Sequence, residues 1–132
     1  MAEALVICDQ VITEAISNKK SLIGIFNALG AIKFPVQHPK LCIYAAMTNG
    51  RGTMQADIRC IRMDDNQQIM QAAGPLEFAD PNQVVELVVT LNNLPFERPG
   101  LYTFELSCDG GLLMEKRFNV FEGTPLRQPP PT

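Results

Sequence analysis

The stretch Arg98–Phe121, RPGLYTFELSCDGGLLMEKRFNVF, decides the fold of this chain. From Tyr102 to Cys108 apolar and polar side chains alternate, which is the period of two of a strand with one buried face. Asp109-Gly110-Gly111 follows, and these residue types tolerate the positive φ angles of a tight turn. The apolar phase of the second arm comprises Leu112, Met114, Phe118 and Val120. Lys116 interrupts that phase, as a strand edge or a β-bulge would allow. The sequence therefore predicts a β-hairpin.

The rest of the chain reads as further short strands between turns rich in Gly, Pro and Asn. A helix over Ala4–Ile16 is the alternative for the first segment, but its β-branched content favours a strand. Gly24 inside the second strand indicates a bulge or a close approach, and Pro35 and Pro39 make the segment between them a loop or an edge. We expect strands over Ala4–Ile12, Ser21–Leu29, Leu41–Met47, Met54–Met63, Gln67–Ala73 and Val84–Asn92.

These segments predict an all-β fold, a two-sheet antiparallel β-sandwich of about eight strands, immunoglobulin-like or similar. A small closed barrel is the alternative. The length of 132 residues fits one domain. We place that domain at residues 1–121 and a Pro-rich C-terminal tail at 122–132, EGTPLRQPPPT.

Composition narrows the function classes. The net charge is −3 and no run of Lys or Arg exceeds two residues, so the basic footprint of a nucleic-acid-binding protein is missing. The first residues, MAEALVICDQ, carry no basic region ahead of an apolar run, which argues against a signal peptide and against a membrane span. The four cysteines, at positions 8, 42, 60 and 108, form no CxxC pair. We expect reduced, mostly buried thiols in a cytoplasmic protein, and no metal site or cofactor.

Three phrases occur together in this chain: Leu22–Phe26 (LIGIF), Phe34–Pro39 (FPVQHP) and Pro95–Gly110 (PFERPGLYTFELSCDG). In this combination the sequence resembles a bacterial family of small proteins classed as a domain of unknown function. The resemblance covers about three-quarters of the chain, and it implies a β-sandwich architecture without an assigned site. More loosely, the last phrase is similar to the final hairpin of immunoglobulin-like and fibronectin-like domains. In that comparison Tyr102 would be a corner tyrosine that bonds back to the preceding crossover.

Three residues are candidates for a ligand site. His38 is the only histidine and could be a general base or a metal ligand, although a loop histidine bonded to a backbone carbonyl is the simpler interpretation. Asp9 lies within an apolar strand, where a carboxylate must be hydrogen-bonded or solvated. Arg51, between two glycines, could contact an anion, but it lacks the context of a phosphate loop.

Other polar groups have structural interpretations. Asp64-Asp65 falls in a hairpin turn, where acidic side chains bond backbone amides. Cys60 and Cys108 lie in the apolar phases of their strands and fit a core. No catalytic constellation is recognisable in the sequence.

The leading hypothesis is therefore a non-enzymatic binding or assembly module with a protein partner, or self-association through a sheet edge or face. A small-molecule binder or enzyme with a site near Asp9 and His38 is the alternative. A structural component of a phage or secretion apparatus is a further alternative, which rests on fold analogy.

Overall fold

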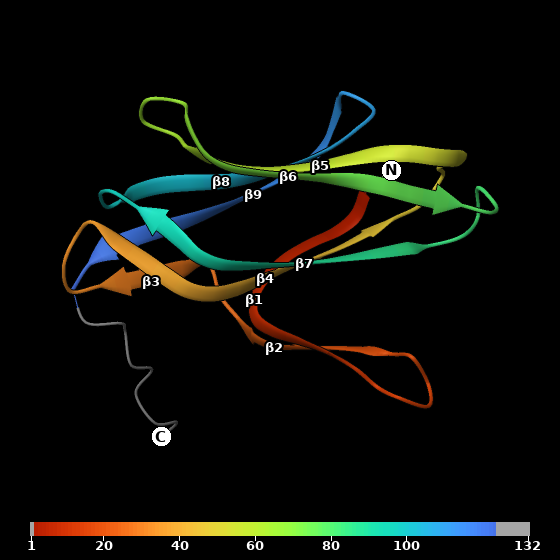
Figure 1. Ribbon diagram of the computed structural model, residues 1–132, viewed down its shortest axis with the longest axis horizontal. Helices are drawn as coiled ribbons and strands as arrows, with labels where there is room; N and C mark the ends of the chain where they lie inside the picture. The colour runs from red at the N-terminus through yellow and green to blue at the C-terminus, as the bar shows by residue number, and fades with distance from the viewer. Residues whose placement is uncertain (1, 124–132) are drawn as a thin grey trace, which may run out of the picture.

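The structure, a computed structural model, describes residues 2–123 and consists of two stacked β-sheets without helices in that range (Figure 1). The four-stranded sheet has the order β2-β1-β4-β7 and the five-stranded sheet has the order β3-β9-β8-β5-β6. The strands are β1 (Ala2–Thr13), β2 (Lys20–Ile25), β3 (Ala28–Ala31), β4 (Val36–Met47), β5 (Gly52–Arg62), β6 (Gln67–Phe78), β7 (Val85–Phe96), β8 (Gly100–Cys108) and β9 (Gly111–Glu122). The predicted sandwich is confirmed, with nine strands where about eight were expected.

The core lies between the sheets and follows the predicted alternation. Tyr102, Phe104 and Leu106 of β8 point inward and are fully buried. Phe118 stacks on Phe104, with ring centroids 5.1 Å apart and planes 14° apart. From the opposite sheet, the inward residues of β1, β4 and β7 include Ile7, Leu41, Ile43, Met47 and Phe96.

The β8–β9 hairpin confirms the central prediction. Asp109 and Gly110 form its two-residue turn with φ angles of 48° and 85°, as a turn with two left-handed residues requires. A register shift between Leu106 and Ser107 marks a bulge at Leu113. The expected inward position of Leu112 was wrong, because the bulge turns Leu113 toward the core and leaves Leu112 57% exposed.

The expected strand Ser21–Leu29 is two strands in different sheets. β2 pairs antiparallel with β1, the chain turns at Phe26-Asn27, and β3 then runs parallel to β9. The Phe26 amide donates to the Ile7 carbonyl at 3.1 Å and the Asn119 amide donates to the Asn27 carbonyl at 3.0 Å, which holds this crossing at both sides. The sandwich is therefore antiparallel except for the β3–β9 pair.

Three proline-containing segments are strands where turns or loops were expected. His38 lies in β4, opposite Leu94 of β7, so its assignment to a loop was wrong. β1 pairs with β4 only as far as Cys8–Cys42, so the first half of β4 has one sheet neighbour and tolerates Pro39 at its free side. β6 likewise continues through Gly74-Pro75, and β7 continues through Pro95.

β1 bends where it leaves β4, and its second half belongs to a two-stranded extension. We call this extension the arm: Asp9–Thr13 of β1 paired with Lys20–Gly24 of β2. In Figure 1 the arm projects away from the sandwich, on the side of the four-stranded sheet that faces away from the five-stranded sheet. β9 extends to Glu122, and the Gly123 amide donates to the Ala31 carbonyl at 2.8 Å. The rest of the predicted tail, residues 124–132, lies outside the described residues.

Candidate functional site

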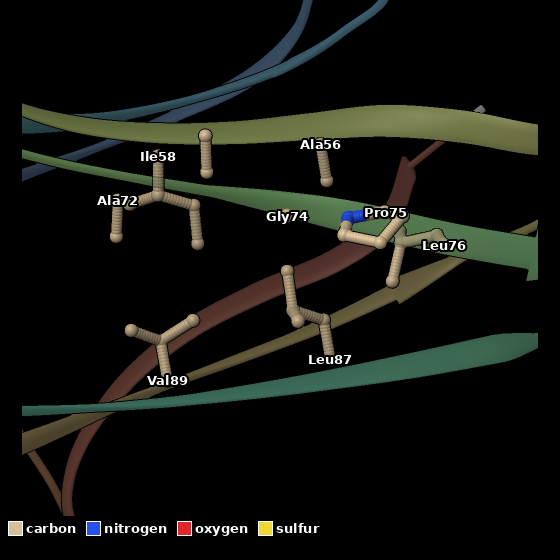
Figure 2. A pocket seen from close by; sticks show the side chains of 9 residues that line it. Ala56, Ile58, Ala72, Gly74, Pro75, Leu76, Leu87 and Val89 are labelled. Carbon is tan, nitrogen blue, oxygen red and sulfur yellow. The ribbon is translucent and has the colours of Figure 1, made fainter.

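The two sheets do not close against each other along β6 and β7, and an apolar cleft opens between these strands (Figure 2). Its volume is about 130 Å³. Leu87 and Val89 of β7 point up into it, and side chains of β5 and β6 point down from the opposite wall. That wall comprises Ala56, Ile58, Ala72, Gly74, Pro75 and Leu76.

The cleft exists because β6 carries small residues where a sandwich strand normally carries large ones. Ala72 and Gly74 occupy the inward phase between the larger Met70 and Leu76. A Cβ added at Gly74 would meet no atom within 4 Å, so the space beside it is open. Because apolar surface facing an unfilled gap loses dispersion contacts, an apolar group entering the cleft would be stabilised there.

The free edge of β6 is partly blocked. Gln55 of β5 directs its backbone away from β6, since its amide donates to Asp109 Oδ1 at 2.8 Å and its carbonyl accepts the Asp109 amide at 2.9 Å. Its cross-strand partner Pro75 therefore points its own backbone to the free edge, as do Ala73 and Glu77. Pro75 has no amide hydrogen to offer a further strand.

The free edge of β7 is uninterrupted. The Ile7 carbonyl points to β2, where it accepts the Phe26 amide, so Ile43 opposite Ile7 must bond to Val89 of β7. The alternate residues of β7 consequently present both N–H and C=O groups outward. These residues are Glu86, Val88 and Thr90. No Lys and no Pro stands between Val85 and Leu94, so the usual protection of an exposed edge is missing here.

A second, larger groove surrounds His38, with a volume of about 440 Å³. We call it the His38 groove. Its walls are mainly apolar, with Ile32, Val36 and Phe96 among them, and its polar side chains include Lys33. The imidazole ring lies 6.3 Å from the Phe26 ring, at an angle of 57°.

The structure does not bring the three predicted site residues together. Asp9 lies in β1 and does not line the His38 groove; its carboxylate covers Gly24 on the neighbouring strand. Gly24 has a φ of 71°, so the predicted close approach is confirmed, with a side chain as the approaching group. Arg51 is exposed in the loop between β4 and β5 and forms no ion pair within residues 2–123.

The structural interpretations of the remaining polar groups hold. Asp65 Oδ1 accepts the Gln67 amide at 3.1 Å, as expected for a turn. Cys60 and Cys108 are buried, and burial raises the pKa of the Cys60 thiol to about 12. Tyr102 donates its hydroxyl hydrogen to the Arg98 carbonyl at 2.6 Å, which confirms the corner tyrosine. None of the described residues forms a cluster of three or more metal-binding side chains.

Sequence reasoning missed Arg62, whose side chain is only 6% exposed at the inward end of β5. The phase of β5 was expected to swap after Cys60, but the bulge lies in β6 and Arg62 keeps the inward direction. Its guanidinium donates two hydrogen bonds to Asp65, at 3.0 and 2.8 Å. This contact holds the pKa of the Asp65 carboxyl well below its usual range. The inward phase of Ala56, Ile58 and Cys60, continued to position 62, was the available signal.

The sequence belongs to a family of unknown function, DUF6941, which it matches over residues 3–121. A search of the curated proteins found no match. No helix in the described part of the chain is long and apolar enough to cross a membrane.

Proposed function

We propose that this protein is a non-enzymatic cytoplasmic binding module whose ligand is an extended polypeptide segment. The segment adds as a further strand to the free edge of β7. Its alternate side chains, which point the same way as Leu87 and Val89, enter the cleft beneath Ala72 and Gly74. Main-chain hydrogen bonds supply affinity in this arrangement, and the apolar cleft selects the side chains.

The observation that carries the proposal is the position of an unprotected strand edge directly beside an apolar cleft. Either feature alone is common in β-proteins. Together they offer backbone donors at Glu86, Val88 and Thr90 and a place for the side chains of the strand that would satisfy them. The side chains that line the cleft are hydrocarbon, so they favour binding over proton transfer. Four free, buried cysteines favour a reducing compartment.

Blocking the edge of β7 without disturbing its pairing to β4 tests the proposal. Val88→Pro removes an outward amide, whereas the ladder to β4 uses its neighbours. The probe is a panel of fluorescent peptides that alternate Val or Leu with Thr or Ser, measured by anisotropy. We expect binding to the unmodified protein and at least tenfold weaker binding to Val88→Pro.

Glu77→Pro is the matched control, because it removes an outward amide from the edge of β6. It should bind the peptides as the unmodified protein does. Equal binding by Val88→Pro, or no binding of any peptide to the folded protein, would contradict the proposal.

A small-molecule site in the His38 groove is the second candidate. Its volume of about 440 Å³ lies in the range of ligand sites, about 300–1,000 Å³. Lys33 and His38 among apolar walls suit an apolar molecule with a carboxylate. A thermal-shift titration with octanoate should stabilise the protein but not a Lys33→Ala, His38→Ala variant. An equal shift in both would exclude the groove as the site.

A further inference from the structure

The outward faces of the two sheets differ in chemistry. On the five-stranded sheet, the outward side chains pair polar groups across strands: Arg59 with Glu105 at 2.8 Å and Gln71 with Asp57 at 2.7 Å. This is the usual solvated face of an antiparallel sheet. On the four-stranded sheet, the corresponding phase is apolar over much of its extent. It includes Ala4, Val6, Cys8, Cys42, Tyr44, Ala46 and Val88, which with the isoleucines of the arm make up what we call the outer face.

The isoleucines of the arm continue this outer face. The register places Ile25 opposite Cys8, Ile23 opposite Gln10 and Ile12 opposite Ser21. Because side chains alternate along a strand, all three isoleucines lie on the side of Cys8. They are 60%, 45% and 42% exposed, respectively. Apolar residues of this size at three positions in one row are not explained by the fold of a single copy.

The arm itself has too few contacts to be stable alone. Beyond Cys8 it consists of two strands, and an isolated two-stranded hairpin is marginally stable in water. Figure 1 shows it extending away from the rest of the molecule. An arm that keeps its β-pairing while exposing an isoleucine row needs a surface to pack against.

The charges around this surface are complementary. Lys19 and Lys20 lie at the tip of the arm, and neither forms a salt bridge with another described residue. At the far end of the outer face, Tyr44 donates to Glu86 at 2.5 Å, and the negative charges of Glu86 and Glu3 contribute to raising the Tyr44 pKa to about 12. One copy therefore carries a basic arm tip and an acidic sheet end, which two copies can pair reciprocally.

We propose that a second copy of this chain covers the outer face, in a two-fold dimer in which each arm lies on the four-stranded sheet of its partner. An interface of this kind uses the same patch on both copies, as closed dimers do. Four strands about 4.8 Å apart and about eight residue steps of about 3.3 Å give roughly 500 Å² in projection. Side-chain relief adds to this, and stable dimers bury about 600–1,000 Å² per partner. This contact leaves the free edge of β7 to the binding function proposed above.

Sedimentation velocity over a wide range of protein concentrations tests the dimer. Ile23→Lys places a charge in the middle of the isoleucine row and should weaken dimerisation at least tenfold, with the monomer still folded by circular dichroism. Leu101→Lys is the matched control, since Leu101 is 43% exposed on the outward face of the five-stranded sheet, against 45% for Ile23. The control should remain a dimer.

Charge reversal tests the orientation. Changing Lys19 and Lys20 to Glu should weaken the dimer, and adding Glu86→Lys to that variant should restore part of the affinity. A monomeric unmodified protein at all concentrations would overturn the proposal, as would a dimer unaffected by Ile23→Lys. A dimer weakened by Ile23→Lys but indifferent to both charge changes would overturn the reciprocal packing of arm tip and sheet end.

Discussion

The carboxylate of Asp9 occupies the position that a side chain at Gly24 would need. The two residues face each other across the β1–β2 pair, where Gly24 has a φ of 71°. A glycine is required twice over at this point, by the backbone conformation and by the neighbouring side chain. The pair therefore accounts for both residues that looked unusual in this part of the sequence, and it gives Asp9 a structural environment.

Gly24→Ala should destabilise the protein by about 1–3 kcal/mol, because alanine is strained at this φ and collides with Asp9. Urea unfolding measures the loss. Asp9→Ala in the same chain should recover part of it, since the collision is relieved while the backbone strain remains. A Gly24→Ala variant as stable as the unmodified protein would show that the arm adopts another conformation in solution.

Tyr102→Phe should cost about 1–2 kcal/mol, because it removes a hydrogen bond to the Arg98 carbonyl from a fully buried side chain. Tyr44→Phe makes the same chemical change at a solvent-accessible hydrogen bond to Glu86 and should cost about 0.5 kcal/mol or less. Thermal unfolding of both variants compares the two sites. Equal losses would mean that Tyr102 has no special part in fixing the β7–β8 crossover.

Local sequence signals predicted the elements that local interactions determine. The β8–β9 hairpin combines alternation with a turn whose residues accept positive φ, and both signals lie within one segment. The split between β2 and β3 was missed because the change of sheet depends on bonds to distant partners, Ile7 and Asn119. β6 was cut at Gly74-Pro75 because an edge tolerates a proline that a central strand would not.

The candidate site was beyond sequence reasoning for a related reason. Its cleft combines side chains of β5, β6 and β7, and what distinguishes it is missing volume at Ala72 and Gly74. Small residues inside a strand carry no local signal of this kind, since their meaning depends on the opposite wall. The chemical candidates Asp9, His38 and Arg51 were found by residue type, and they lie at separate places in the fold.

The Cys60 thiol should be almost unreactive in the folded protein. Burial raises its pKa to about 12, so the thiolate that reacts with iodoacetamide is scarce at pH 8. Peptide mapping after brief alkylation should show Cys60 unmodified in buffer and fully modified in urea. Because the raised pKa favours the neutral thiol of the folded state, its contribution to stability is full below about 8.5, the ordinary thiol pKa, and falls at higher pH. Rapid alkylation without denaturant would contradict the burial of β5.

The contact between Arg62 and Asp65 predicts how acid destabilises the protein. The buried guanidinium lowers the carboxyl pKa in the folded state, so the pair stabilises the fold above about pH 4, the ordinary carboxyl range. As the pH falls below that range, the unfolded state binds a proton that the folded state resists, and this stabilisation is lost. Asp65→Asn should therefore be less stable than the unmodified protein at pH 7, and the difference should shrink as the pH is lowered from about 4 to about 2. Glu115→Gln removes an exposed contact of 3.8 Å to Arg117 and should match the unmodified protein throughout. Urea unfolding at a series of pH values measures all three proteins. A difference between Asp65→Asn and the unmodified protein that stays constant with pH would mean that Asp65 acts only through its hydrogen bond to the Gln67 amide, which asparagine preserves poorly, and that the charge on Arg62 is balanced by other groups.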